Sequence, residues 1–169
     1  MNPEYLIISG TNRLDSASIK VATEYFNRLT KAGKSCELYS LEGFKWFQRT
    51  PDFLELQERL FIPAQKFIFV MPEYNGSVPG VLKLMIDLLD YKRTWHLKKV
   101  LLVGVSSGRA GNLRGMEHMT GILHYLKAVV HPNKLPISRV DLLVINGVLN
   151  LDQETSRAVD LQIEEFIAF

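Results

Sequence analysis

The sequence has little of several features that would mark a specialised class of protein. Its 169 residues include one cysteine, Cys36, so no internal disulfide can form, and this favours a reducing compartment such as the cytoplasm. No apolar run approaches membrane-spanning length, and Met1–Glu4 does not resemble a signal peptide. The net charge of +2 comes without a basic stripe. We therefore expect a cytoplasmic protein with no nucleic-acid partner and no membrane association.

Familiar metal-binding and nucleotide-binding motifs are also missing. The four histidines share no ligand spacing with one another or with Cys36, so no metal site is expected. Neither a Walker A loop nor the G-x-G-x-x-G dinucleotide fingerprint occurs. Cys36 lies in an alternating segment that is typical of a strand, which argues against a role as a nucleophile.

What remains is an ordinary globular composition with a repeating pattern of elements. Hydrophobic content of 47% and charged content of 22% predict one domain, residues 1–169, with a substantial core. Apolar segments predict five strands, at 5–9, 36–40, 66–71, 99–105 and 129–131. Helical spacing predicts helices from Ile19 to Gly33, from an Asp52 cap to about Pro63, from about 80 to Arg93, over 113–127, and after an Asp152 cap. Residues 140–145 fit either a strand end or a helical turn.

Strand–loop–helix units that recur five times predict a parallel sheet with helices on both faces. The fold class expected is a flavodoxin-like, doubly wound α/β arrangement with five strands in the order 2-1-3-4-5. Its switch point lies between strands 1 and 3, where ligands bind in such sheets. The two loops richest in turn residues, 10–18 and 72–80, follow these two strands. The sequence therefore predicts a ligand site at this edge.

The first loop has the chemistry of a phosphate site. Hydroxyls at Thr11, Ser16 and Ser18 precede a helix start, where backbone N–H groups attract anions. Arg13 adds bidentate recognition of phosphate, and Asp15 is expected to face solvent. Simple helix capping by Ser16 or Ser18 is the alternative interpretation.

The second and third loops suit a flat heterocycle. Two prolines stiffen the 72–80 loop, and Tyr74 offers a flat apolar wall. Glu73 is expected to be a solvated carboxylate rather than a general base. The 106–111 loop can bring its backbone close to the far edge of such a ring. A phosphate on one loop and a flat ring between two others describe flavin mononucleotide (FMN).

Two motifs give the chain a family resemblance. Gly10-Thr11-x-Arg13-x-x-Ser16-x-Ser18 and the more specific run from Pro72 to Asp87 resemble the NADPH-dependent FMN reductase family. That family has a flavodoxin-like fold and includes quinone, azo-dye and chromate reductases. This chain departs from the family in having Thr11 for Ser, Ser18 for a frequent Asn, and Leu88 for a common Trp.

The resemblance implies a role for each loop. By it, Thr11, Arg13, Ser16 and Ser18 would hold the phosphate. The second loop would lie along the isoalloxazine ring, with Pro72, Glu73, Tyr74, Asn75 and Gly76. The third loop would approach the pyrimidine end of the ring, with Ser106, Gly108 and Gly111. We name no catalytic side chain, because the cofactor carries the chemistry.

The predicted function is an FMN-dependent oxidoreductase. It would pass electrons from NADPH or NADH through FMN to a small quinone, azo, flavin or similar acceptor, and the resemblance favours a homodimer or homotetramer. One alternative is a non-enzymatic electron carrier of the flavodoxin type, which the slightly basic charge disfavours. Another is a flavin-binding regulatory module, with the aromatic group at 44–47 serving a partner or, in a dimer, covering the flavin of the neighbouring subunit.

Overall fold

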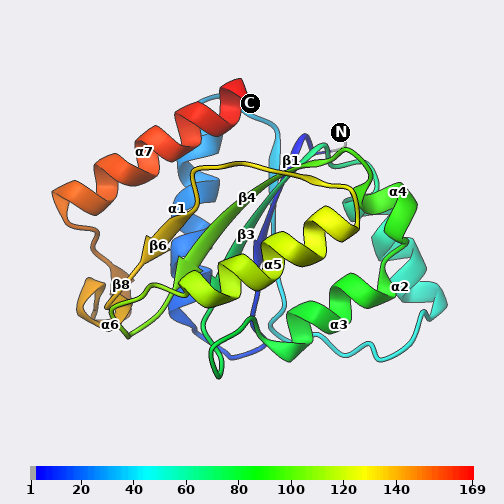
Figure 1. Cartoon of the computed structure of the whole chain (residues 1–169), viewed down its shortest axis with the longest axis horizontal. Coiled ribbons are helices and arrows are strands. Elements are labelled where there is room, and N and C mark those ends of the chain that lie inside the picture. Colours follow the sequence, from blue (N-terminus) through cyan, green and yellow to red (C-terminus); the bar gives the residue numbers. More distant parts are fainter. Residues whose placement is uncertain (1–2) are drawn as a thin grey trace.

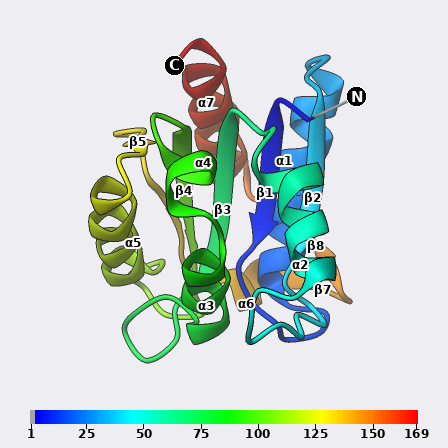
Figure 2. The same ribbon diagram turned by 90° about the vertical axis from the view of Figure 1, so that its right-hand side faces the viewer.

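The computed structural model describes residues 3–169 and places a parallel sheet between two layers of helices (Figures 1 and 2). The sheet order is β2-β1-β3-β4-β5, with β6 also paired to β4. This confirms the predicted order and the flavodoxin-like class. The strands are β1 (Tyr5–Ser9), β2 (Cys36–Ser40), β3 (Lys66–Pro72), β4 (Lys99–Val105), β5 (Val129–Val130) and β6 (Leu135–Ile137).

The central strands β1, β3 and β4 are apolar along most of their length because helices cover both of their faces. Alternate residues of β3 point to opposite cores: Phe67 and Phe69 to one, Ile68 and Val70 to the other. Helices α1 (Ala17–Lys31) and α7 (Gln153–Ala168) cover the second of these cores. The first core lies under α2 (Pro51–Leu56), α3 (Gly80–Leu88), α4 (Tyr91–Trp95) and α5 (Leu113–Tyr125).

The expected helix from 80 to Arg93 is wrong, because two helices occupy this stretch. Leu89 is extended, with ψ of 150°, and ends α3. Asp90 then caps α4, where its carboxylate accepts the backbone N–H groups of Lys92 and Arg93. Apolar residues continue across the break, and this conceals it in the sequence.

The expected Asp52 cap is also wrong. Thr50 is the N-cap residue and Pro51 takes the first helical position, which suits a residue with no N–H group. Asp52 lies in the first turn and accepts a hydrogen bond from the Trp46 indole at 2.8 Å. The helix does reach Phe61, but its last five residues, Gln57–Phe61, form a π-helical turn.

The fifth strand was expected to be one segment, 129–131, but it is divided. β5 pairs with the start of β4, the chain leaves the sheet at Pro132, and β6 pairs with the end of β4. Residues 140–145 contain both a helical turn and a strand, the two alternatives that the sequence allowed. Helix α6 (Val140–Leu143) leads into β7 (Val144–Ile145), which pairs with β8 (Val148–Leu149).

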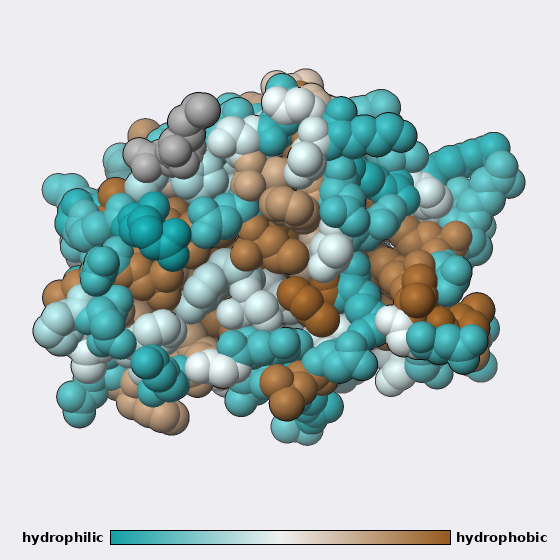
Figure 3. Space-filling view, turned by 180° about the vertical axis from the view of Figure 1, so that it is seen from behind, coloured by the Kyte–Doolittle hydropathy of each residue, from teal (hydrophilic) through white to brown (hydrophobic). Residues whose placement is uncertain are grey.

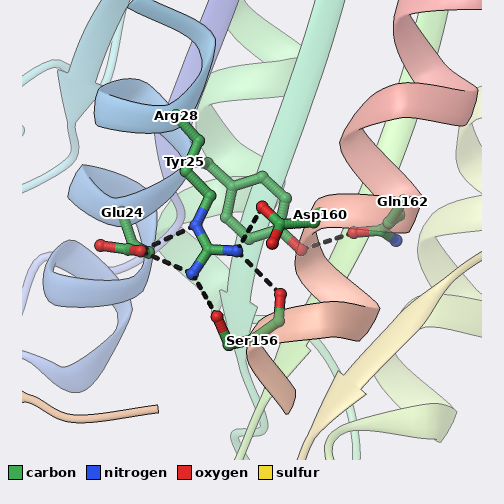
Figure 4. A network of polar contacts seen from close by, with 6 residues as sticks. All are labelled: Glu24, Tyr25, Arg28, Ser156, Asp160 and Gln162. Carbon is green, nitrogen blue, oxygen red and sulfur yellow. Dashed lines mark hydrogen bonds and ion pairs between the residues drawn. The ribbon is translucent and has the colours of Figure 1, made fainter. Parts of the chain in front are cut away.

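A polar network holds α1 against α7 (Figure 4). The Arg28 guanidinium donates a hydrogen bond to Glu24 on its own helix. It also donates to Asp160 at 2.7 Å and to the Ser156 carbonyl at 2.8 Å, both on α7. Deeper in the interface, the Tyr25 hydroxyl donates to Gln162 at 2.5 Å. These contacts fix α1, whose N-terminus borders the loops considered next.

Candidate functional site

The three predicted loops meet at the carboxyl ends of β1, β3 and β4. Together with α6 they line a pocket of about 290 Å³. Seven of the predicted site residues line it: Arg13, Ser16, Ser18, Pro72, Glu73, Tyr74 and Ser106. Thr11, Asn75, Gly76, Gly108 and Gly111 belong to the same loops but do not line this pocket.

At the first loop, the pocket meets the N-terminus of α1. Ser16 is the N-cap residue and its hydroxyl accepts the Ile19 N–H at 3.2 Å, while Ser18 is buried. The first N–H groups of any helix lack intrahelical partners, so they offer donors to an anion. Within the described residues, the first turn of α1 has no acidic side chain. As expected, Asp15 is exposed, and it pairs with Lys20.

Direct contacts join the first loop to the second. The buried Thr11 hydroxyl lies 2.6 Å from the Tyr74 hydroxyl and accepts the Arg13 N–H at 3.2 Å. The Arg13 guanidinium lies over the Tyr74 ring, 4.1 Å from its centroid. Thr11 therefore contacts the hydroxyl end of Tyr74 and does not line the pocket, a link that the sequence does not reveal.

The tip of the second loop is a tight hairpin. Tyr74 and Ser77 exchange both backbone hydrogen bonds, at 2.9 and 3.1 Å. Between them Asn75 and Gly76 have φ of 53° and 73°, as two-residue hairpin turns of type I′ require. The Ser77 hydroxyl lies 2.9 Å from Nδ1 of His118 on α5. His118 is exposed on α5, and no pattern in the sequence indicates its contact with this loop.

The third loop is held by backbone contacts to the end of β6 and to the residues that follow it. The Ser106 N–H donates to the Ile137 carbonyl at 3.0 Å, and the Arg139 N–H donates to the Gly108 carbonyl at 3.1 Å. Gly111 has φ of 57° and packs on Pro136 so closely that a Cβ would clash with its backbone. Gly111 thus lies beneath the loop, where it permits close packing.

These groups fit FMN by their chemistry. Arg13, two serine hydroxyls and a helix N-terminus suit the phosphate. Tyr74 and Pro72 add flat apolar surface to the pocket lining, and the Arg13 guanidinium covers one face of the Tyr74 ring. In residues 3–169 no group of three or more His, Cys, Asp or Glu side chains is arranged to hold a metal ion. No helix in the same range combines the length and apolarity needed to cross a bilayer.

Comparison with solved structures defines the fold class. The fold superimposes on FerB, a flavoenzyme NAD(P)H:(acceptor) oxidoreductase from Paracoccus denitrificans, with a TM-score of 0.75. The match covers 98% of this chain and 96% of that one at 20% identity, so it shows a shared flavodoxin-like fold.

Sequence comparison then identifies the family. Residues 3–141 match the NADPH-dependent FMN reductase family, and the chain belongs to it. It is 28% identical to an NAD(P)H-dependent FMN reductase of Pseudomonas aeruginosa, over 95% of this chain and 86% of that protein. It is 30% identical to the NADH:(hydroxy)cinnamate reductase subunit CrdA of Vibrio ruber over 70% of this chain, but spans only 61% of that relative. Membership places the chain among NAD(P)H-dependent oxidoreductases that use FMN.

Proposed function

We propose that the chain, as a single domain, binds FMN in the three-loop pocket and passes electrons from NADH or NADPH to a small acceptor such as a quinone. The observation that supports this most strongly is the convergence of seven predicted site residues on one pocket at the switch point of the sheet. Since the one cysteine fits a reducing compartment, we place the enzyme in the cytoplasm.

The phosphate would be held at the first loop. Arg13 would pair with two phosphate oxygens, the Ser18 hydroxyl would donate one hydrogen bond, and the first turn of α1 would supply N–H groups. Ser16 already caps the helix, so it would also orient these N–H groups. Among the residues that the structure describes, the first turn of α1 has no acidic side chain, and this keeps the local electrostatic potential favourable for an anion.

The ring would lie between the second and third loops. Bound FMN supplies the two-electron redox chemistry. Tyr74, held by Thr11 and stacked under Arg13, provides a fixed aromatic surface. Asn75 and Gly76 follow pocket-lining Tyr74 in the hairpin, and Gly108 follows pocket-lining Ser106 and Ser107, so the backbone at both places would border the ring. The protein's contribution is thus binding, orientation and exclusion of water, and we assign no side chain as acid or base.

Removal of the phosphate-binding guanidinium tests this assignment. Arg13→Ala should weaken FMN binding about tenfold or more, because a charge-assisted contact contributes about 1.5–3 kcal/mol. The matched control is Arg157→Ala, an exposed arginine on α7. FMN affinity is measured by quenching of flavin fluorescence. Equal affinity in both variants would contradict the phosphate site.

The acceptor is proposed only as a class. The names of the Vibrio and Paracoccus proteins describe reductases of small molecules or of unspecified acceptors, which supports a small-molecule acceptor here. Oxidation of NADPH or NADH is followed over minutes as the loss of absorbance at about 340 nm, with benzoquinone, an azo dye or free FMN as the acceptor. Turnover with a free acceptor supports an enzyme. Flavin binding without turnover would instead favour an electron carrier.

A second copy of the chain is the proposed protein partner. An apolar groove of about 870 Å³ runs between α3 and α5, bordered by the exposed rings of Tyr91 and Tyr125. Ser77, at the tip of the second loop, lines the same groove, so an assembly there would adjoin the FMN pocket. Light scattering on the 19.3 kDa chain should give twice or four times that mass. A monomeric mass at micromolar concentration would contradict a homodimer or homotetramer.

A further inference from the structure

The Arg13 side chain lies on an aromatic ring of the pocket lining. Its guanidinium carbon is 4.1 Å from the centroid of the Tyr74 ring, and both residues line the same pocket. Flat groups stack on one another at about this separation, since carbon atoms pack best at about 3.5–4 Å. The guanidinium therefore takes up the space on this face of the ring that a flat ligand would need in order to stack there.

Tyr74 is fixed in place, whereas the end of the Arg13 side chain is not. The Tyr74 hydroxyl lies 2.6 Å from the buried Thr11 hydroxyl, and the Tyr74 backbone exchanges two hydrogen bonds with Ser77. The backbone N–H of Arg13 is held by the same Thr11 hydroxyl, at 3.2 Å. The Arg13 guanidinium is exposed, and within residues 3–169 it makes no ion pair. Since exposed side chains change rotamer within nanoseconds, the guanidinium can leave the ring while both loops stay in place.

The N-terminus of α1 offers an anion site within the same loop. Ser16, three residues after Arg13, is the N-cap residue of α1, and Ser16 and Ser18 line the pocket together with Arg13. Asp15 is paired with Lys20. A charge-assisted bond between arginine and phosphate contributes about tenfold or more in affinity, whereas a cation–π contact at an exposed site contributes about two- to fivefold. Arg13 therefore leaves the ring when a phosphate binds at this terminus.

We infer that Arg13 acts against flavins that lack a phosphate, because it covers the Tyr74 ring and uncovers it only for a ligand whose phosphate it can bind. When FMN binds, Arg13 moves to the phosphate and frees the ring for the isoalloxazine. Riboflavin has the same isoalloxazine but no phosphate, so it must displace the guanidinium from the ring and loses affinity by the value of that contact. This inference rests on the proposed function, since it places the flavin in the three-loop pocket.

The test measures the binding of FMN and of riboflavin to the flavin-free protein by quenching of flavin fluorescence. Arg13→Ala should weaken FMN binding about tenfold or more but tighten riboflavin binding about two- to fivefold. A residue that only binds phosphate would leave riboflavin affinity unchanged, so the opposite signs distinguish the two roles. Arg13→Lys keeps the charge but loses the flat group, so it should also tighten riboflavin binding, by a smaller factor.

The control is Arg157→Ala, an exposed arginine on α7, which should change neither affinity. On the face opposite to that of Figure 1, small apolar groups lie between hydrophilic residues (Figure 3). Riboflavin that binds to such groups would do so equally in every variant, so the readout is the difference between variants rather than a single affinity.

Inorganic phosphate provides a second measurement on the unmodified protein. At millimolar concentration it should tighten riboflavin binding about two- to fivefold, because Arg13 then binds the phosphate and leaves the ring. Potassium chloride at the same ionic strength should have no such effect. In Arg13→Ala, phosphate should leave riboflavin affinity unchanged.

The outcomes separate this inference from the proposed function. If Arg13→Ala weakens FMN binding but leaves riboflavin affinity unchanged or lower, the phosphate site stands and the exclusion of unphosphorylated flavin is overturned. Riboflavin that binds neither the unmodified protein nor the alanine variant would overturn it as well. If FMN affinity is also unchanged in Arg13→Ala, the phosphate site of the proposed function falls together with the inference.

Discussion

The contact between Thr11 and Tyr74 allows a sharp test of how the first two loops are held together. Tyr74→Phe keeps the ring under Arg13 but removes the hydroxyl that lies 2.6 Å from the Thr11 hydroxyl. Loss of one hydrogen bond of this kind costs about 1 kcal/mol. Because the bond orders both loops before FMN arrives, we expect FMN affinity to fall about fivefold.

A double-mutant cycle isolates that bond. Thr11→Val loses the same contact and also the acceptor for the Arg13 N–H, so its effect should be larger, about 2 kcal/mol. The double variant should then be little worse than Thr11→Val alone, which gives a coupling of about 1 kcal/mol. FMN affinity is measured by fluorescence titration, with Tyr125→Phe, an exposed tyrosine, as the control. Additive effects would refute the coupling between the loops.

Three further predictions concern the scaffold around the site. Gly104→Ala should lower the free energy of unfolding by about 1–3 kcal/mol in urea, because a Cβ there would meet the carbonyl of Gly111; unchanged stability would contradict that packing. His118→Ala should free the Ser77 end of the hairpin and shift the flavin reduction potential, with secondary structure unchanged by circular dichroism; an unchanged potential would show that the contact has no influence on the ring. Burial raises the pKa of Tyr5 to about 12, so its neutral form stabilises the fold below pH 10 and that contribution is lost as pH rises toward 12. The melting temperature of the Tyr5→Phe variant should therefore fall less than that of the unmodified protein between about pH 9 and about pH 12, the range in which the phenol titrates. An identical fall in both proteins would contradict this prediction.

Much of the fold could be predicted because local pattern and global topology agree. Four of the strands were expected within a residue of their observed ends, since the three central ones are almost continuously apolar, β2 alternates, and Gly or polar residues follow them. The errors in the helices have one cause. At Asp90 and Thr50 a single capping residue decides where a helix begins, and the apolar periodicity continues past the boundary. The division of the fifth strand depends on which part of β4 each piece pairs with, a contact between distant segments.

For the candidate site, residue types were predictable and arrangement was not. Loop composition pointed to phosphate chemistry at Arg13, Ser16 and Ser18, all of which line the pocket. The sequence predicts Thr11 as a phosphate ligand, but it does not indicate the contact of the Thr11 hydroxyl with Tyr74, 63 residues away. The pairing of Arg139 with the third loop also joins segments that only the tertiary fold brings together. Long-range hydrogen bonds of this kind leave no periodic signal in a single sequence.

A crystal structure of the protein with FMN tests the central claim most directly. Electron density should place the phosphate beside Arg13 at the N-terminus of α1, and the isoalloxazine between the Tyr74 hairpin and the 106–111 loop. FMN bound elsewhere, or a pocket that remains filled by Arg13 and Tyr74 at saturating FMN, would contradict the assignment of this edge of the sheet as the flavin site.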